Sequence, residues 1–133
     1  MLSTRRTLLS IAAALVSGCM LASSAHAGEK FAFDKVAFEA AQKAGKSILV
    51  EVAAPWCPTC KAQAPILGEL RDQPKFKDLV LFTVDFDSQK PVLAGLKAQS
   101  QSTLIVYKGD KEVGRSVGDT KKDSIEALLT KAL

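Results

Sequence analysis

Residues 48–65 read ILVEVAAPWCPTCKAQAP, a stretch that joins an apolar run to a pair of cysteines. The run at 47–54 is nearly continuous in apolar residues, many of them branched, which is typical of a strand buried on both faces of a parallel sheet. A helical pattern of apolar residues follows at 59–71. The sequence therefore predicts that Cys57 and Cys60 lie at the start of a helix, directly after a buried strand.

Two more amphipathic helices are predicted near the ends of the domain. The first begins after Asp34, a favourable N-cap, and stops at Gly45. Its apolar side comprises Phe33, Val36, Ala37, Ala40 and Ala41. The last helix opens near Thr120 and Asp123, which resemble an N-terminal capping pair. Its apolar stripe comprises Ile125, Leu128, Leu129 and Ala132.

The remaining segments supply the rest of a sheet. A second buried strand is predicted at 78–86, a short helix at 90–99, and two strands at 102–118 that are joined by a tight turn at 109–110. A further short strand is expected at 30–33. Alternating strands and helices followed by a hairpin predict an α/β domain with a central mixed sheet flanked by helices on both faces.

The first 27 residues predict an export signal. Two arginines at 5–6 precede an apolar run at about 7–21, and Ala-His-Ala at 25–27 fits a signal cleavage site. The run is shorter than a membrane-spanning helix requires. The sequence favours cleavage after Ala27, which leaves residues 28–133 as one exported domain, periplasmic in a bacterium.

A second location stays open. Val-Ser-Gly-Cys at 16–19 resembles a bacterial lipobox, in which Cys19 would be lipidated and would anchor the mature chain. Cleavage after Ala27 would discard Cys19 and also the only histidine, His26. That cleavage would exclude histidine-dependent catalysis and Cys/His metal sites from the mature domain.

Composition limits the partners of this domain. Basic and acidic residues are interspersed, aromatic residues make up 6% of the chain, and the net charge is only +4. This pattern lacks the basic, aromatic footprint of a nucleic-acid-binding protein. A chain of 133 residues with no obvious dimerisation segment is expected to form one domain and to be a monomer.

Three roles are open to the cysteine pair. At a helix start, Cys57 is predicted to be an exposed nucleophile and Cys60 a more buried resolving thiol, while Pro58 suits the first turn. A zinc site normally needs four ligands, and the mature chain offers only these two soft ones. A structural disulfide closing so short a loop would add little stability. The spacing favours a redox pair that needs neither a metal nor an organic cofactor.

In this order and spacing, the motifs resemble the thioredoxin family across residues 30–133. The resemblance is carried by the opening stretch with Trp56 before the cysteines, by VDFD at 84–87, and by the hairpin at 103–118. The WCPTC form is also similar to exported reducing thioredoxins that serve cytochrome c maturation. The resemblance implies a thioredoxin fold and a thiol–disulfide oxidoreductase that acts on protein thiols and disulfides.

The resemblance also implies residue roles. Glu51 occupies the place of a buried acid that assists proton transfer to and from Cys60, and burial in an apolar strand suits it to that task. The alternative is a carboxylate near the surface or paired with a lysine. Trp56 is expected beside the active site or as a core aromatic. Lys61 is expected in solvent, and Pro65 is expected to be structural.

Two departures from the family stand out. A cis-proline usually precedes the strand that begins here at Thr103, and Ser102 takes its place. A non-prolyl cis bond costs about 3–4 kcal/mol, so the Gln101–Ser102 bond is either held cis by its surroundings or trans. Leu81 stands where many thioredoxins place a lysine near the buried acid, which predicts a more readily protonated Glu51.

The direction of electron flow is also predicted from the resemblance. Strongly oxidising relatives carry a histidine between the cysteines, and Thr59 supplies no positive charge, which favours a reductant. An exported reductant requires electrons from outside its oxidising surroundings, so the implied donor is a transmembrane thiol protein. The rival functions are a disulfide oxidase or isomerase, and a copper or iron–sulfur binding module that uses Cys57 and Cys60 and lacks the shielding proline.

Overall fold

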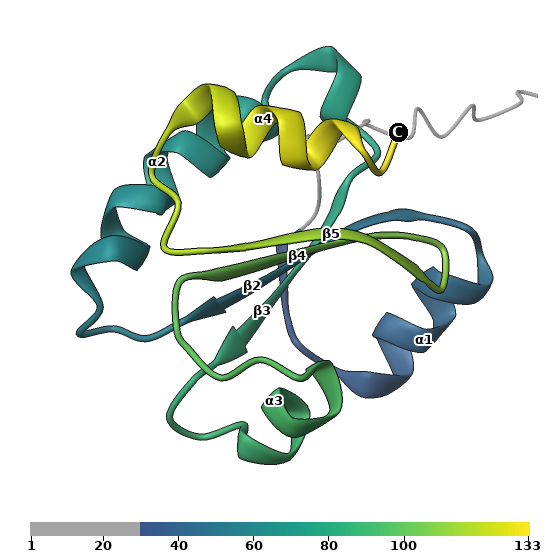
Figure 1. Ribbon diagram of the computed structural model, residues 1–133. Coiled ribbons are helices and arrows are strands. Elements are labelled where there is room, and N and C mark those ends of the chain that lie inside the picture. The colour runs from purple at the N-terminus through teal and green to yellow at the C-terminus, as the bar shows by residue number, and fades with distance from the viewer. Residues whose placement is uncertain (1–29) are drawn as a thin grey trace, which may run out of the picture.

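A computed structural model describes residues 30–133, so the predicted signal at 1–27 and the lipobox cysteine lie outside the described residues. The fold alternates strands and helices as predicted (Figure 1). In chain order the elements are β1 (Lys30–Ala32), α1 (Lys35–Lys43), β2 (Ser47–Ala53), α2 (Pro58–Arg71), the 3-10 turn η1 (Pro74–Phe76), β3 (Val80–Asp85), α3 (Lys90–Leu96), β4 (Thr103–Lys108), β5 (Lys111–Val117) and α4 (Lys122–Thr130).

The five strands form one mixed sheet in the order β1-β3-β2-β4-β5. β1 and β2 run parallel to β3, whereas β4 is antiparallel to both β2 and β5. The tight turn between β4 and β5 uses Gly109 at φ 59°, a left-handed conformation that glycine adopts without steric cost. The predicted mixed sheet with a terminal hairpin is confirmed.

Helices cover both faces of the sheet, α2 and α4 on one and α1 and α3 on the other (Figure 1). Alternate residues of each strand point to opposite faces. On β2, Leu49 therefore joins the cluster under α2 and α4, and Ile48 joins the cluster under α1 and α3. The sheet thus separates two apolar cores, and it holds the end of β2 and the start of α2 in fixed positions.

The caps of α1 and α4 differ in how well the sequence predicted them. Asp34 caps α1 as expected and accepts a hydrogen bond from the Ala37 N–H at 2.8 Å. The capping pair proposed for α4 is wrong. The N-cap of α4 is Lys121, whose side chain makes no capping hydrogen bond. Asp119, two residues before it, accepts from the Lys121 N–H and the Ser124 hydroxyl.

The apolar side predicted for α1 also needs correction. Val36 is 76% exposed, and Phe38 is the buried residue of this helix. Phe38 packs edge-to-face against Phe82 and Tyr107, because its ring points toward the sheet. The apolar stripe of α4 is confirmed, since all four of its predicted members are buried.

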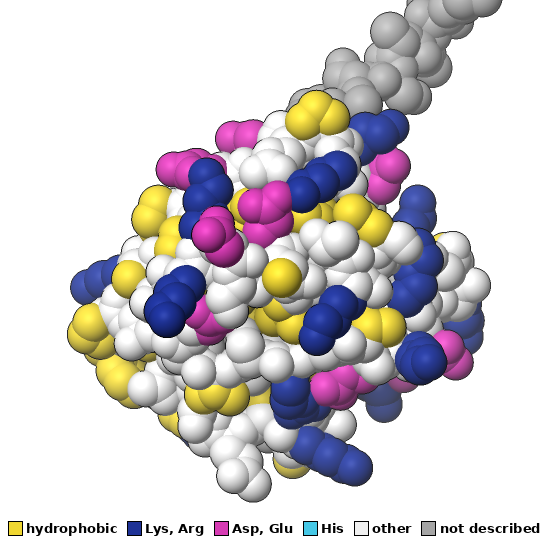
Figure 2. Space-filling view, turned by 45° about the horizontal axis from the view of Figure 1, so that its top comes forward, with side chains coloured by type: hydrophobic (Ala, Val, Ile, Leu, Met, Phe, Trp, Pro, Cys, Tyr) yellow, Lys and Arg dark blue, Asp and Glu magenta, His cyan; other side chains and the backbone are white. Residues whose placement is uncertain are grey.

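The outer surface carries charges of both signs. Figure 2 shows basic and acidic side chains interspersed over the face that α2 and α4 form. Several lie in ion pairs, such as Lys122 with Glu69 at 2.6 Å. Within residues 30–133, no helix is long and apolar enough to cross a membrane.

Candidate active site

Cys57 is the N-cap of α2, the position directly before the first helical residue. Its backbone is extended, and its Sγ accepts a hydrogen bond from the Cys60 N–H at 3.1 Å. Pro58 follows in the first turn, where a missing N–H leaves no bond unmade. The helix N-terminus therefore favours negative charge on the Cys57 sulfur whenever the pair is reduced.

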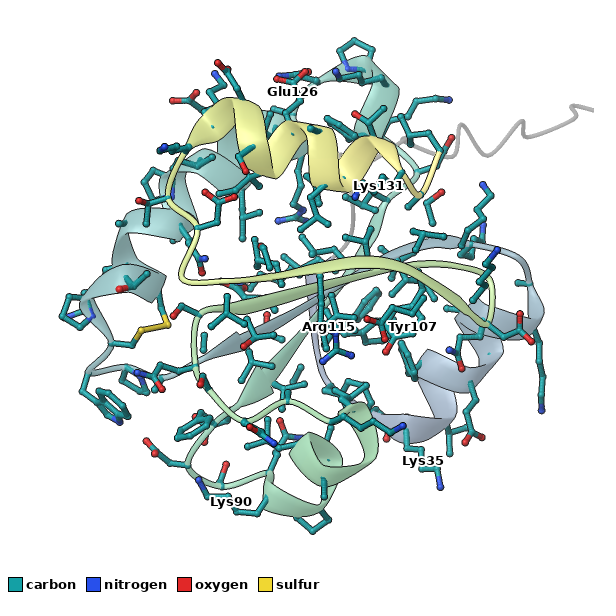
Figure 3. The ribbon with its side chains drawn as sticks, viewed as in Figure 1. Lys35, Lys90, Tyr107, Arg115, Glu126 and Lys131 are labelled. Carbon is teal, nitrogen blue, oxygen red and sulfur yellow. A yellow bond between two sulfur atoms is a disulfide. The ribbon has the colours of Figure 1, made fainter. Side chains whose placement is uncertain are left out.

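The two cysteines form a disulfide, the yellow bond at the start of α2 in Figure 3. Their Cα atoms are 5.3 Å apart, a usual separation for this bond. The prediction of an exposed Cys57 is wrong for this oxidised state, because Cys57 is 1% exposed and Cys60 is 5% exposed. A turn closed by the Cys57 N–H and the Ala54 carbonyl packs both sulfurs against the end of β2.

Glu51 lies in the middle of β2 and is 4% exposed, so its predicted burial is confirmed. Its side chain lies on the sheet face that α2 covers. The Thr83 hydroxyl on β3 donates to Glu51 Oε2 at 3.3 Å, and the Lys30 Nζ lies 3.6 Å from the same oxygen. The carboxyl group is therefore both buried and paired with a lysine.

This lysine comes from β1, the short strand expected at 30–33, whose neighbour in the sheet the sequence did not indicate. Lys30 is the first residue of β1 and pairs in register with Leu81 on β3. Residue 81 lies on β3, next to β2, whereas Lys30 lies on the edge strand β1. The Lys30 ammonium group thus reaches Glu51 across β3. Lys30 therefore provides the cationic partner of Glu51, in place of a lysine at position 81.

A groove of about 640 Å³ runs beside these residues, with Glu51, Lys30 and Cys60 among its walls. Cys57 does not line it. At the groove's edge, hydrogen bonds from the side chain and backbone of Ser88 hold the pKa of Asp85 below its ordinary value. Because Cys60 and Glu51 both line the groove, the second cysteine, and not Cys57, shares a cavity with the buried acid.

Trp56 lies at the surface beside the disulfide. It is 55% exposed, its Nε1 donates to Asp87 Oδ2 at 2.8 Å, and its ring meets Phe86 edge-on with centroids 6.5 Å apart. It is therefore a residue of the site's rim, and the alternative of a core aromatic is wrong. The hydrogen bond and the ring contact fix the indole next to the helix start.

The loop before β4 contains the position where relatives have a cis-proline. The Gln101–Ser102 peptide bond is trans, and Ser102 adopts φ 53°, in the left-handed region. Ser102 is 6% exposed, while Gln101 is half-buried. The next residue, Thr103, is buried and pairs with Val52 near the end of β2. The loop therefore stands at the same edge of the sheet as the cysteine pair.

The other predicted residues of the site follow from the geometry of α2. Thr59 is half-buried between the cysteines, Lys61 points into solvent as expected, and Pro65 lies inside the helix. In the part of the chain that the structure describes, no group of three or more His, Cys, Asp or Glu side chains is placed to hold a metal ion.

Sequence reasoning missed Gln63. This residue is fully buried in α2, three residues after Cys60, and its amide nitrogen donates to the backbone carbonyl of Ser102 at 3.2 Å. A signal was present, because a glutamine occupied a position on the apolar side of a helix that packs on a sheet. Its partner lies 39 residues away, so the pairing could not be read from spacing.

Comparison with known proteins places these features in a family. The family model described as Thioredoxin matches residues 29–131. The chain is 37% identical over 93 residues to a thioredoxin H-type of Brassica campestris, which covers 70% of this chain and 73% of that protein.

Solved structures agree with this match. The crystal structure of Trxlp from Edwardsiella tarda superposes with a TM-score of 0.74 at 40% identity, covering 76% of this chain and 98% of that one. The thioredoxin NaTrxh of Nicotiana alata gives a TM-score of 0.68 at 30% identity, with 83% and 97% covered. This chain therefore belongs to the thioredoxin family and is a thiol–disulfide oxidoreductase of its protein-disulfide reductase type, with Cys57 and Cys60 as the Cys-x-x-Cys pair.

Proposed function

We propose that this protein is an exported reductant of protein disulfides, with Cys57 as the nucleophile. In the reduced pair, the Cys57 thiolate attacks one sulfur of a substrate disulfide. A mixed disulfide forms between Cys57 and the substrate, and the other substrate sulfur leaves as a thiolate that takes up a proton. The observation that carries this assignment is the N-cap position of Cys57, where the Cys60 N–H already points at its sulfur.

Cys60 completes the reaction. Its thiol loses a proton to the Glu51 carboxylate and attacks the Cys57 sulfur, which releases the second substrate thiol and leaves the Cys57–Cys60 disulfide. The substrate gains two electrons and two protons, and the pair is oxidised. The shared groove supports this division of roles, since it brings Cys60 and Glu51 to one cavity. The pair itself carries the electrons, so no organic cofactor or metal takes part.

The reductant direction rests on the residue between the cysteines and on the environment. Thr59 places no positive charge beside the Cys57 thiolate, so the reduced form gains no stabilisation beyond that of the helix N-terminus, and this favours a reducing couple. The signal-like residues 1–27 support export, after cleavage at Ala27 or with an anchor at Cys19. In oxidising surroundings the disulfide would be reduced again by a membrane thiol protein. The domain would act as a monomer.

The reduction potential of the Cys57–Cys60 couple tests this direction. The mature domain is equilibrated in dithiothreitol or glutathione buffers, and the fraction of disulfide is read by thiol trapping. A reductant requires a value near or below about −270 mV, the thioredoxin range. A value approaching about −120 mV would overturn the proposal and make the protein a disulfide donor.

A further inference from the structure

Gln63 has an unusual place for a polar side chain. It is 0% exposed, and it lies one helical turn after Cys60 on the same side of α2. Its Nε2 donates two hydrogen bonds, to the Ser102 carbonyl at 3.2 Å and to the Asp119 carbonyl at 2.8 Å. Its Oε1 is buried without a partner among the described residues.

The orientation of this amide is fixed by its partners. Both are backbone carbonyl oxygens, which only accept hydrogen bonds, so the nitrogen must face them. The opposite orientation would bring three oxygens together. A buried oxygen without a partner is unfavourable, and an apolar side chain of similar size would avoid it. What Gln63 contributes is therefore the pair of bonds that its nitrogen makes.

These bonds join three segments at one end of the sheet. The Ser102 carbonyl also accepts from the Gly118 N–H at 2.9 Å, which ties the loop before β4 to the residue that follows β5. The carboxylate of Asp119 accepts hydrogen bonds at the start of α4, as described above. Gln63 thus links the helix that carries the cysteines to the loops before β4 and before α4.

The loop before β4 needs such a link. Ser102 holds a left-handed backbone conformation that L residues avoid unless their surroundings impose it. No proline ring restricts the backbone here. Two hydrogen bonds on the Ser102 carbonyl, one of them from Gln63, are the contacts that hold this carbonyl in place.

We propose that Gln63 is a positioning residue of the reductase. It holds the Ser102 loop against α2, and in doing so it shapes the surface beside the Cys57–Cys60 pair where a protein disulfide docks. Gln63 touches neither the substrate nor the sulfurs, and it acts through the Ser102 carbonyl. This inference rests on the proposed function in one respect, namely that protein disulfides are the substrates.

Replacement of Gln63 by leucine tests the proposal, because leucine keeps most of the volume and removes both N–H donors. We expect the KM for a protein disulfide such as oxidised insulin to rise about tenfold with little change in kcat, as for a lost docking contact. The reaction with a small disulfide, dithiobis(nitrobenzoate), should keep its rate. Backbone amides at 100–103 should exchange hydrogen faster than in the wild type.

Two further variants separate positioning from general destabilisation. Ser47→Ala removes another side-chain to backbone hydrogen bond, to the Ala132 carbonyl at the far end of β2. It should leave KM and the exchange at 100–103 unchanged. Gln63→Met also lacks the N–H donors, but its unbranched chain has a shape closer to that of glutamine. It should reproduce the leucine result, because the effect then comes from the lost hydrogen bonds and not from poor packing of leucine.

An unchanged KM together with unchanged exchange at 100–103 would overturn the inference. Equal losses with insulin and with the small disulfide would also overturn it, since they would indicate a merely structural role. Failure of the proposed function is recognised separately, because the wild type would then not reduce insulin at all. Hydrogen exchange needs no substrate, so it tests the positioning of the loop in either case.

Discussion

At the scale of single residues, Ser102 and Glu51 owe their properties to neighbours that are distant in sequence. Ser102 occupies a left-handed conformation that costs an L residue about 1–2 kcal/mol. Glu51 keeps a carboxyl group inside an apolar sheet, with the Thr83 hydroxyl and the Lys30 ammonium at its Oε2. The positive φ of Ser102 and the burial of the Glu51 carboxyl group are both unfavourable by themselves, and each persists because hydrogen bonds or an ion pair stabilise it.

The backbone of Ser102 predicts an unusual order of stability for two variants. Ser102→Gly should be more stable than Ser102→Ala by about 1 kcal/mol, because glycine adopts positive φ freely and alanine does not. At ordinary loop positions the order is the reverse, since glycine makes the unfolded chain more flexible. Urea unfolding of both variants measures the difference. An alanine variant that equals or exceeds the glycine variant would contradict the left-handed conformation.

The buried acid predicts a kinetic effect. Glu51→Gln keeps the shape of the side chain but cannot accept the Cys60 proton, so the resolving step should slow about 10²-fold and the mixed disulfide should accumulate. Single-turnover quenching with acid, followed by mass analysis, detects that intermediate. Glu69→Gln, at an exposed position of α2, is the control with the same change of side chain and should behave as the wild type. Equal rates for both variants would remove Glu51 from the mechanism.

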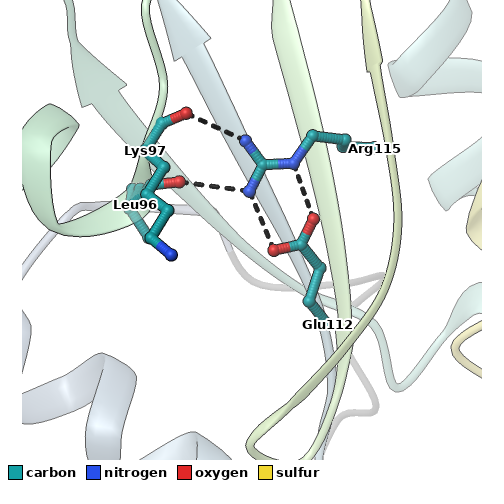
Figure 4. Close-up of polar contacts among 4 residues, drawn as sticks. All are labelled: Leu96, Lys97, Glu112 and Arg115. Carbon is teal, nitrogen blue, oxygen red and sulfur yellow. Dashed lines mark hydrogen bonds and ion pairs between the residues drawn. The ribbon is translucent and has the colours of Figure 1, made fainter.

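At the scale of elements, Arg115 joins β5 to the end of α3 (Figure 4). Its guanidinium donates to the Leu96 and Lys97 carbonyls, both at 3.1 Å, and to both carboxylate oxygens of Glu112. The last carbonyls of a helix lack partners within the helix, so a cation placed there stabilises the end of α3. This link fixes α3 against the sheet without any contact with the disulfide.

The same network predicts a pH dependence. Hydrogen bonds from Arg115 hold the pKa of Glu112 below its ordinary value of 4.5. The stability that this ion pair provides is therefore complete above that value and is lost as the pH falls through the lower folded pKa. Because the pair is exposed, Glu112→Gln should lower the free energy of unfolding by less than about 1 kcal/mol at pH 7. The difference from the wild type should vanish in strong acid.

Arg115→Gln supplies the comparison for that measurement. It also removes the hydrogen bonds to the two α3 carbonyls, which do not titrate. Part of its deficit should therefore remain at low pH, when urea unfolding is repeated across the acid range. A deficit for Glu112→Gln that grows as the pH falls would have the wrong sign for a lowered pKa.

At the scale of the whole molecule, the sheet divides the interior into two cores. Ile125 of α4 lies in the core under α2 and α4, and Ile48 of β2 lies in the core under α1 and α3. The site stands where the carboxyl end of β2 meets both loops that Gln63 links. The residues of the site are therefore carried by β2, by α2 and by these loops.

This division predicts that core substitutions on opposite faces act independently. Ile48→Val and Ile125→Val should each lower the free energy of unfolding by about 0.5–1.5 kcal/mol, since both side chains are fully buried. The double variant should show the sum within about 0.5 kcal/mol. Denaturant unfolding of the four proteins provides this cycle. A coupling well above that limit would indicate that the two cores repack together.

The sequence predicted the elements well because their signals are local. Periodicity located β2, α2 and the terminal hairpin, and Asp34 marked the start of α1. The prediction failed at the start of α4, where two neighbouring residues are equally suited to accept a hydrogen bond from the backbone. Asp119 and Thr120 both carry side-chain oxygens that can accept a hydrogen bond near a helix start. The path of the chain makes Lys121 the N-cap, and it is Asp119 that accepts from the Lys121 N–H and the Ser124 hydroxyl.

By itself, the sequence determined the order of strands and helices, the cysteine pair at the start of α2, and the burial of Glu51, because apolar period and residue type act over a few neighbours. Only the tertiary structure decided which residues serve the site from afar. Lys30 reaches Glu51 because β1 pairs beside β3, and Gln63 holds Ser102 because α2 packs against the end of the sheet. Such contacts depend on strand order and helix packing, which no short stretch of sequence encodes.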